Sequence, residues 1–140
     1  MNERGDIDPE FDPAKHSLTD SSYFEDLEVG QRFVIPSRTL GDANFAAFQF
    51  LSGDNHPIHY DVEYCRRRGH PQLLAHGFQV VSQTAPGAGM LPHVLEDSLI
   101  ALIEQSSKFL KPVYCGDTVY PALIIRELTP GKTKIGRAHV

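Results

Sequence analysis

The chain has 140 residues, enough for one domain with one core, and its 41% hydrophobic and 22% charged residues are typical of a soluble globular protein. The formal charge of −5 argues against nucleic-acid binding, which needs a basic surface. No apolar run approaches the roughly 18 residues of a membrane helix, so we expect no membrane segment. Two cysteines, expected as reduced thiols, and a polar acidic N-terminus favour a cytoplasmic protein.

The N-terminal region and the start of the domain differ in composition. Residues 1–22 are rich in Asp, Glu, Pro and Ser, which predicts a flexible arm, and we expect a single domain over residues 23–140. The domain is expected to begin with a turn around Val29 and Gly30 and a short strand near 32–36.

The next element is a predicted helix. Asp42 is expected to cap a helix over residues 43–52, and Gly53 to end it in the left-handed conformation. Phe45, Phe48 and Leu51 recur at helical spacing, so we expect all three to face a core.

A second helix and a sheet follow. The stretch LLAHGFQVVSQTA (73–85) predicts a helix with Leu74, Phe78 and Val81 on its apolar face, stopped or kinked by Pro86 and Gly87. Residues 98–113 and 117–128 are expected strands around the turn YCGD (114–117). Another turn at 129–132 leads into one more strand from 133. This order predicts an α+β domain, a helix packed on an antiparallel sheet.

The stretch SGDNHPIH (52–59) concentrates the polar chemistry of the chain, and three interpretations compete for it. Asp54, His56, His59 and His76 could ligate zinc or iron, but no cysteine pair or helical His pair supports a site, so we expect no metal. The loop could also be a solvated helix end. Alternatively, Pro57 stiffens the loop so that Asp54 and His59 converge on a small ligand such as a water, a carboxylate–imidazole pair suited to acid–base catalysis.

A second feature matches the acid–base interpretation. AHGF (75–78) opens the second apolar helix, where backbone N–H groups lack intrahelical partners and Gly77 allows close approach. Such a group suits a developing oxyanion. The alternative for Gly77 is close packing of the helix on the sheet.

These residues resemble a known family. FLSGDNHPIHYD (50–61) followed by LLAHGF (73–78) resembles the MaoC-like hydratases, the (R)-specific enoyl-CoA hydratase branch of the hotdog superfamily. FEDLEVGQRF (24–33) and KFLKPVYCGDTV (108–119) agree with it, and the resemblance covers about residues 23–134.

The resemblance implies a fold, an activity and a site. The hotdog fold would wrap a long central helix, about 76–90, in an antiparallel sheet, usually dimerised edge to edge. The activity would be a hydro-lyase of fatty acid metabolism, interconverting 2-enoyl and 3-hydroxyacyl thioesters of coenzyme A or acyl carrier protein without a cofactor. Asp54 and His59 match the catalytic pair that holds the water, and Gly77 matches the residue whose N–H binds the thioester oxygen. The residues expected to line the substrate site are Asn55, His56, Pro57, His76, Ser82 and Thr84.

Two departures keep other functions open. His56 stands where the family often has Asn, and Ala85 falls where it has an active-site serine. A hotdog thioesterase would typically carry an acidic residue on the central helix, yet 77–90 contains no Asp or Glu. A non-catalytic acyl-thioester binder or partner subunit is the third possibility.

The end of the chain carries its own expectation. The hotdog sheet should continue after TPGKTK, whereas the chain stops at Val140, so we expect the last strand to be missing. IGRAHV (135–140) is also the translation of a common sequencing-adapter DNA followed by a stop codon, and we hypothesise that these residues are not native. The codons for 135–140 test this hypothesis.

Overall fold

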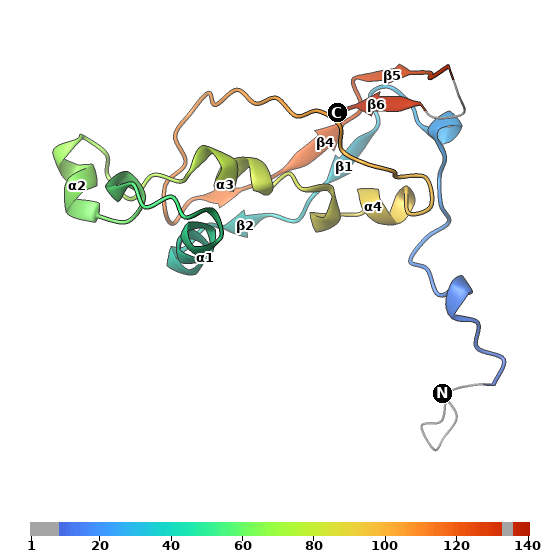
Figure 1. Ribbon diagram of the computed structural model, residues 1–140, viewed down its shortest axis with the longest axis horizontal. Helices are drawn as coiled ribbons and strands as arrows, with labels where there is room; N and C mark the ends of the chain where they lie inside the picture. The colour runs from blue at the N-terminus through green and yellow to red at the C-terminus, as the bar shows by residue number, and fades with distance from the viewer. Residues whose placement is uncertain (1–8, 133–135) are drawn as a thin grey trace.

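The computed structural model describes residues 9–132 and 136–140 (Figure 1). Its helices are η1 (Pro13–Lys15), η2 (Phe24–Asp26), α1 (Asp42–Ser52), η3 (Pro57–His59), α2 (Val62–Arg67), α3 (Gly77–Ser82), η4 (Pro86–Ala88) and α4 (Leu91–Val94). Its strands are β1 (Arg32–Val34), β2 (Arg38–Thr39), β3 (Thr118–Val119), β4 (Ala122–Ile124), β5 (Glu127–Thr129) and β6 (Arg137–His139). The α+β class is confirmed. None of the helices described here has the length and apolar character needed to cross a membrane.

The strands pair as three antiparallel ladders: β1 with β4, β2 with β3, and β5 with β6. Phe33 lies opposite Leu123 in the first ladder, and both side chains are buried. The expected turns lie where predicted, since Gly30 and Gly116 adopt positive φ angles of 91° and 98°. The antiparallel sheet is therefore confirmed, in three short pieces.

The apolar core has two parts. One joins the β1–β4 ladder to α4, through Leu27, Phe33, Ile35, Leu91, Leu95, Leu123 and Ile125. The other packs α1 and the start of α3 against the β2–β3 ladder, around Leu40, Phe45 and Ala75. The second part supports the segment that carries the polar loop.

Helix α1 corrects two predictions. Gly41, not Asp42, is its N-cap residue, and the Asn44 side chain accepts a hydrogen bond from the Gly41 N–H at 2.9 Å. Gly53 ends the helix at φ 69°, as predicted. Phe45 is 1% exposed but Leu51 is 81% exposed, so Leu51 does not face the core. Leu51 lies six residues after Phe45, and at about 100° per residue its side chain points about 120° away from that of Phe45 around the helix axis. This direction lies outside the narrow buried face of α1.

The long central helix predicted over 76–90 is interrupted. It is divided into α3, η4 and α4, with the break at Pro86 and Gly87, the residues expected to stop or kink it. Leu74 lies before α3, in an isolated bridge with Tyr114, and Phe78 is exposed. The predicted apolar face was thus wrong for these two. The buried residue of α3 is polar instead, Gln79, and its C-cap residue Gln83 is buried as well.

Residues 98–113 were predicted to form a strand, and this prediction is wrong for the described chain. The segment has no ladder partner in the part of the chain that the structure describes, and in Figure 1 it passes over α3 as an open connection. Its exposed apolar side chains are Leu99, Ile100, Leu102, Ile103, Phe109 and Leu110. Backbone groups need a partner strand to form a ladder, and no described strand lies beside this one.

The two ends of the chain are described in part. Residues 9–20 of the predicted arm extend away from the rest of the molecule in Figure 1, and residues 1–8 lie outside the described residues. The predicted strand over 117–128 is present as β3, β4 and β5, and β5 pairs with β6 in an antiparallel ladder. Residues 133–135, where one more strand is expected to start, also lie outside the described residues.

Candidate active site

Asp54 opens a tight loop that follows α1. Its Oδ1 accepts a hydrogen bond from the backbone N–H of His56 at 3.1 Å, which folds the loop back on itself. This hydrogen bond is the main reason why the pKa of Asp54 lies below its usual value, with smaller contributions from nearby histidines. The side chain is 50% exposed. Asp54 therefore presents an ionised carboxylate to solvent near neutral pH.

His59 lies at the end of η3, which Pro57 begins and the His56 side chain caps by accepting from the Ile58 N–H at 3.2 Å. The His59 Nδ1 lies 2.6 Å from the carbonyl oxygen of Leu74. A carbonyl only accepts, so Nδ1 carries the proton and Nε2 keeps its lone pair. Burial lowers the pKa of His59, which favours the neutral ring.

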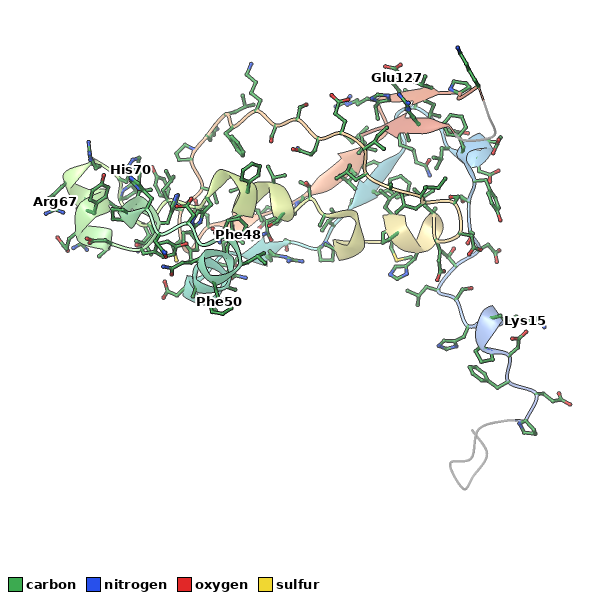
Figure 2. All side chains as sticks on the ribbon, viewed as in Figure 1. Lys15, Phe48, Phe50, Arg67, His70 and Glu127 are labelled. Carbon is green, nitrogen blue, oxygen red and sulfur yellow. The ribbon has the colours of Figure 1, made fainter. Side chains whose placement is uncertain are left out.

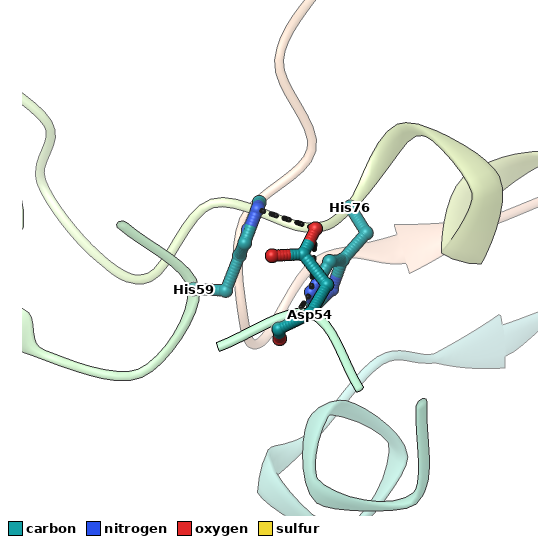
Figure 3. Close-up of side chains that lie close together, drawn as sticks. All are labelled: Asp54, His59 and His76. Carbon is teal, nitrogen blue, oxygen red and sulfur yellow. Dashed lines mark hydrogen bonds and ion pairs between the residues drawn. The ribbon is translucent and has the colours of Figure 1, made fainter. Parts of the chain in front are cut away.

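His76 completes a cluster with these two residues (Figure 3). It is the N-cap of α3 and only 4% exposed. The Asp54 Oδ2 lies 3.7 Å from His76 Nε2 and 3.9 Å from His59 Nε2. The rings of His59 and His76 stack with centroids 3.6 Å apart, and the Tyr60 hydroxyl lies 2.9 Å from His76 Nε2. Two loops and the start of α3 thus bring one carboxylate and two imidazoles together.

The cluster forms the polar wall of a pocket of about 410 Å³. The lining residues are Phe48, Ser52, Asp54, His59, His76, Gly77, Phe78 and Phe109. Gly77 is the first residue of α3, and within the described chain its N–H has no hydrogen-bond acceptor. A Cβ on Gly77 would lie 3.0 Å from the Phe109 ring, so this ring closely covers the glycine. The pocket therefore combines an apolar wall with a free N–H beside the polar cluster.

The remaining predicted site residues lie outside this pocket. Asn55 accepts a hydrogen bond from Gln49 and lines a separate cavity of about 330 Å³, together with residues of α1. The hydroxyls of Ser82 and Thr84 donate to the carbonyl oxygens of Gln79 and Val81. His56 and Pro57 shape the loop, as described above. A substrate-binding role for these five residues stays a prediction.

Sequence reasoning missed several residues of the site. Tyr60 directly follows His59, and its position next to the motif was a signal that could have drawn attention to it. Phe48 was assigned to the core, but its ring lies 4.8 Å from that of His76, and Figure 2 shows it on the side of α1 that faces α3. Phe109 had no signal, because its contact with Gly77 depends on the path of an irregular segment.

The cluster also contains a set of atoms that a metal could use. The ligand atoms of Asp54, His59 and His76 lie within 4.8 Å of one another. However, an imidazole binds a metal in its own ring plane, and the two ring planes are stacked and inclined by only 21°. The lone pairs of stacked rings run side by side and do not converge, so the arrangement fits proton transfer better than metal ligation.

Comparison with known proteins shows the family of the chain. Residues 26–138 match the MaoC like domain family. The (R)-specific enoyl-CoA hydratase of Rhodospirillum rubrum is 29% identical over 117 residues, 79% of this chain and 74% of that protein. The 3-hydroxybutyryl-CoA dehydratase of Methylorubrum extorquens is 29% identical over 116 residues, 80% of this chain and 69% of that protein.

A solved structure gives the same result. The (R)-hydratase from A. caviae superimposes with a TM-score of 0.63 at 30% identity, over 74% of this chain and 76% of that one. The chain therefore belongs to the MaoC-like domain family. Its fold is the hotdog fold, so the resemblance drawn from the sequence motifs is confirmed.

Proposed function

We propose that the protein is a hydratase/dehydratase, a hydro-lyase that interconverts 2-enoyl and 3-hydroxyacyl thioesters of coenzyme A or acyl carrier protein. The observation that carries the proposal is the 3.9 Å separation of Asp54 Oδ2 and His59 Nε2 at the wall of a pocket. Two atoms that share one water, each at about 2.8 Å, lie roughly 4 to 4.5 Å apart. The separation of 3.9 Å falls just below this range, so a small outward movement of either side chain lets the pair hold a single water.

The chemistry follows from this spacing. The water oxygen adds to the β-carbon of the enoyl group, and the pair takes one of its protons. The same proton is then delivered to the α-carbon, so one water is added across the double bond. Each acid–base group contributes a rate factor of about a hundred to ten thousand. Both groups are deprotonated near neutral pH, since the pKa values of Asp54 and His59 are lowered.

The thioester oxygen gains negative charge as the water adds. The Gly77 N–H lines the same pocket and has no acceptor among the described residues, so it is available to that oxygen. Phe48, Phe78 and Phe109 would surround the acyl group with apolar surface. This division of the pocket supports a thioester substrate with an apolar acyl chain.

One assay separates this function from the alternatives. The purified protein is incubated with crotonyl-CoA while enoyl absorbance and free thiol are both followed. Loss of absorbance without thiol release is expected. Thiol release would show a thioesterase, and saturable binding without either change would show a non-catalytic binder.

We also propose a homodimer and a cytoplasmic location. The extended segment 98–113 exposes apolar side chains and forms no ladder with any described strand, which favours pairing with a second copy. Cys65 and Cys115 are both free thiols, as expected in a reducing compartment.

A further inference from the structure

The proton positions in the cluster present a problem of hydrogen bonding. Asp54 Oδ2 is an acceptor, and His59 Nε2 is one too because its Nδ1 carries the proton against Leu74. If His76 Nε2 also keeps a lone pair, three acceptors face one another. The outcome depends on which nitrogen of His76 is protonated, and two residues outside the predicted site decide it.

Gln79 is the first of these residues. Its Oε1 lies 3.4 Å from the backbone N of His76 and 3.4 Å from the His76 Nδ1. The backbone N–H can only donate, so the amide oxygen must face it. If the amide were rotated by 180°, its NH₂ group would face the His76 backbone N–H, and both groups are donors. With the oxygen in this orientation, Nδ1 has an acceptor to which it can donate, which favours the tautomer of neutral His76 with its proton on Nδ1.

The fold keeps this orientation although it leaves another group unpaired. Gln79 is 2% exposed, and its Nε2 has no partner among the residues the structure describes. Among the described residues, the Gln79 side chain therefore interacts with His76 through its amide oxygen and not through its amide nitrogen.

Tyr60 is the second residue. Its hydroxyl lies 2.9 Å from His76 Nε2, and burial raises the pKa of Tyr60, so the hydroxyl stays protonated. Since Nε2 of His76 carries a lone pair, the hydroxyl donates to it. The acceptor on His76 is then occupied, and the two hydrogens of a water in the cluster are left with Asp54 and His59.

We propose that Tyr60 and Gln79 are positioning residues that act through His76 and direct the reacting water to the Asp54–His59 pair. The role rests on the proposed hydratase function. Gln79 sets the ring tautomer of His76, and Tyr60 satisfies the lone pair that this tautomer exposes. Without the Tyr60 hydroxyl, His76 competes for a hydrogen of the water and turns it away from the β-carbon.

The tautomer is tested without any assay of activity. In the full chain labelled with ¹⁵N-histidine, ring nitrogen shifts distinguish a protonated nitrogen from one with a lone pair, and His76→Asn identifies the signals of His76. We expect a protonated Nδ1 and an unprotonated Nε2. The Asp54 carbonyl oxygen, 3.3 Å from His76 Nε2, would accept from the opposite tautomer, and finding the proton on Nε2 overturns the proposal.

Variants of Gln79 separate tautomer control from packing. Gln79→Leu should populate both tautomers, whereas Gln79→Glu keeps an acceptor and should retain the wild-type signals. Gln83→Leu is the matched control, because Gln83 is buried at the C-cap of the same helix and, among the described residues, its side chain donates to Gln79 O and Ser82 Oγ and not to His76. Unchanged His76 signals in a folded Gln79→Leu protein contradict the role of Gln79.

Kinetics then test the consequence for the water. Tyr60→Phe should lower kcat about ten-fold and leave KM within about two-fold, since a misplaced reactant slows chemistry more than binding. Tyr120→Phe, at an exposed tyrosine, should change neither. In a His76→Asn background, adding Tyr60→Phe should lower kcat by less than two-fold, because Tyr60 acts through His76 and this histidine is absent.

The outcomes keep this role apart from the hydratase proposal. A wild-type protein without hydratase activity refutes the proposed function, while the nitrogen shifts still decide the tautomer. An active wild type with a near-normal Tyr60→Phe variant, or full additivity of the two substitutions, overturns the positioning role.

Discussion

The imidazole rings of His59 and His76 stack with centroids 3.6 Å apart and planes inclined by 21°. Two stacked imidazolium ions would repel each other at this separation, so the stack disfavours protonation of His59. The neighbouring His76 is also one of the causes that lower the pKa of His59, after burial. Burial first, and the stacked ring second, therefore lower the pKa of His59 and favour a neutral base beside the Asp54 carboxylate.

The first prediction concerns the catalytic pair. Asp54→Asn and His59→Ala should each lower kcat about a hundred-fold or more, because each removes a group that moves a proton. Circular dichroism should show an unchanged fold, since both side chains lie at the edge of the pocket. Asp97→Asn and His93→Ala, at positions outside the pocket lining, are the matched controls. A near-normal rate in either pair variant would refute its catalytic role.

The pH dependence follows from the lowered pKa of His59, whose ordinary value is 6.5. The reaction needs the neutral ring, so kcat/KM should fall on the acid side with a midpoint below 6.5. The free energy of unfolding should also fall as the pH is lowered. A lowered pKa means that the unfolded chain binds the proton more tightly, so His59 stabilises the fold above 6.5 and loses this contribution as pH falls through its folded pKa. A rate profile with its acid midpoint above 6.5 would contradict this.

The oxyanion role of Gly77 is tested by a structure with a bound, unreactive thioester analogue. Its carbonyl oxygen should lie within about 3 Å of the Gly77 nitrogen. The Phe109 ring should remain over the glycine or move aside with the acyl chain. A thioester oxygen that hydrogen-bonds elsewhere, with the Gly77 N–H facing solvent, would show that the assignment is wrong.

The proposed homodimer gives another prediction. Light scattering should show a dimer, and the backbone amides of residues 99–104 should be protected from hydrogen exchange by pairing with the second copy. Leu102→Asp should weaken the dimer, while Leu18→Asp, at an equally exposed leucine of the N-terminal arm, should not. A clean monomer at all concentrations would refute the dimer.

The last stability prediction compares two phenylalanines of α1. Phe45→Ala should lower the free energy of unfolding by about 3 to 5 kcal/mol, the usual cost of removing a buried aromatic ring. Phe50→Ala should cost less than about 0.5 kcal/mol, because this ring is 94% exposed and points away from α3 (Figure 2). Equal losses in a denaturant titration would contradict this account of the core.

Local sequence signals predicted the local features well. Gly53 and Gly116 adopt positive φ angles, a conformation that glycine tolerates better than any other residue of their turns. The position of a glycine in a turn can be read directly from the sequence. Asp54 and His59 lie in one short stiff loop, so their convergence needed no knowledge of the fold.

Features that depend on distant segments were not predictable in this way. Residues 98–113 have the composition of a strand, but a strand requires a partner, and composition says nothing about one. His76 and Tyr60 meet only because the loop after α1 packs against the start of α3. Buried glutamines such as Gln79 also break the rule that apolar residues mark the inner face of a helix.

The most direct test of the central claim follows the oxygen of the added water. The protein is incubated with crotonyl-CoA in ¹⁸O-water, and the products are analysed by mass spectrometry. The account predicts an intact coenzyme A thioester that has gained one water, with ¹⁸O in its 3-hydroxyl group. The Asp54→Asn variant should form almost none of this product. Finding ¹⁸O in a free carboxylate, with coenzyme A released and the double bond intact, would contradict it.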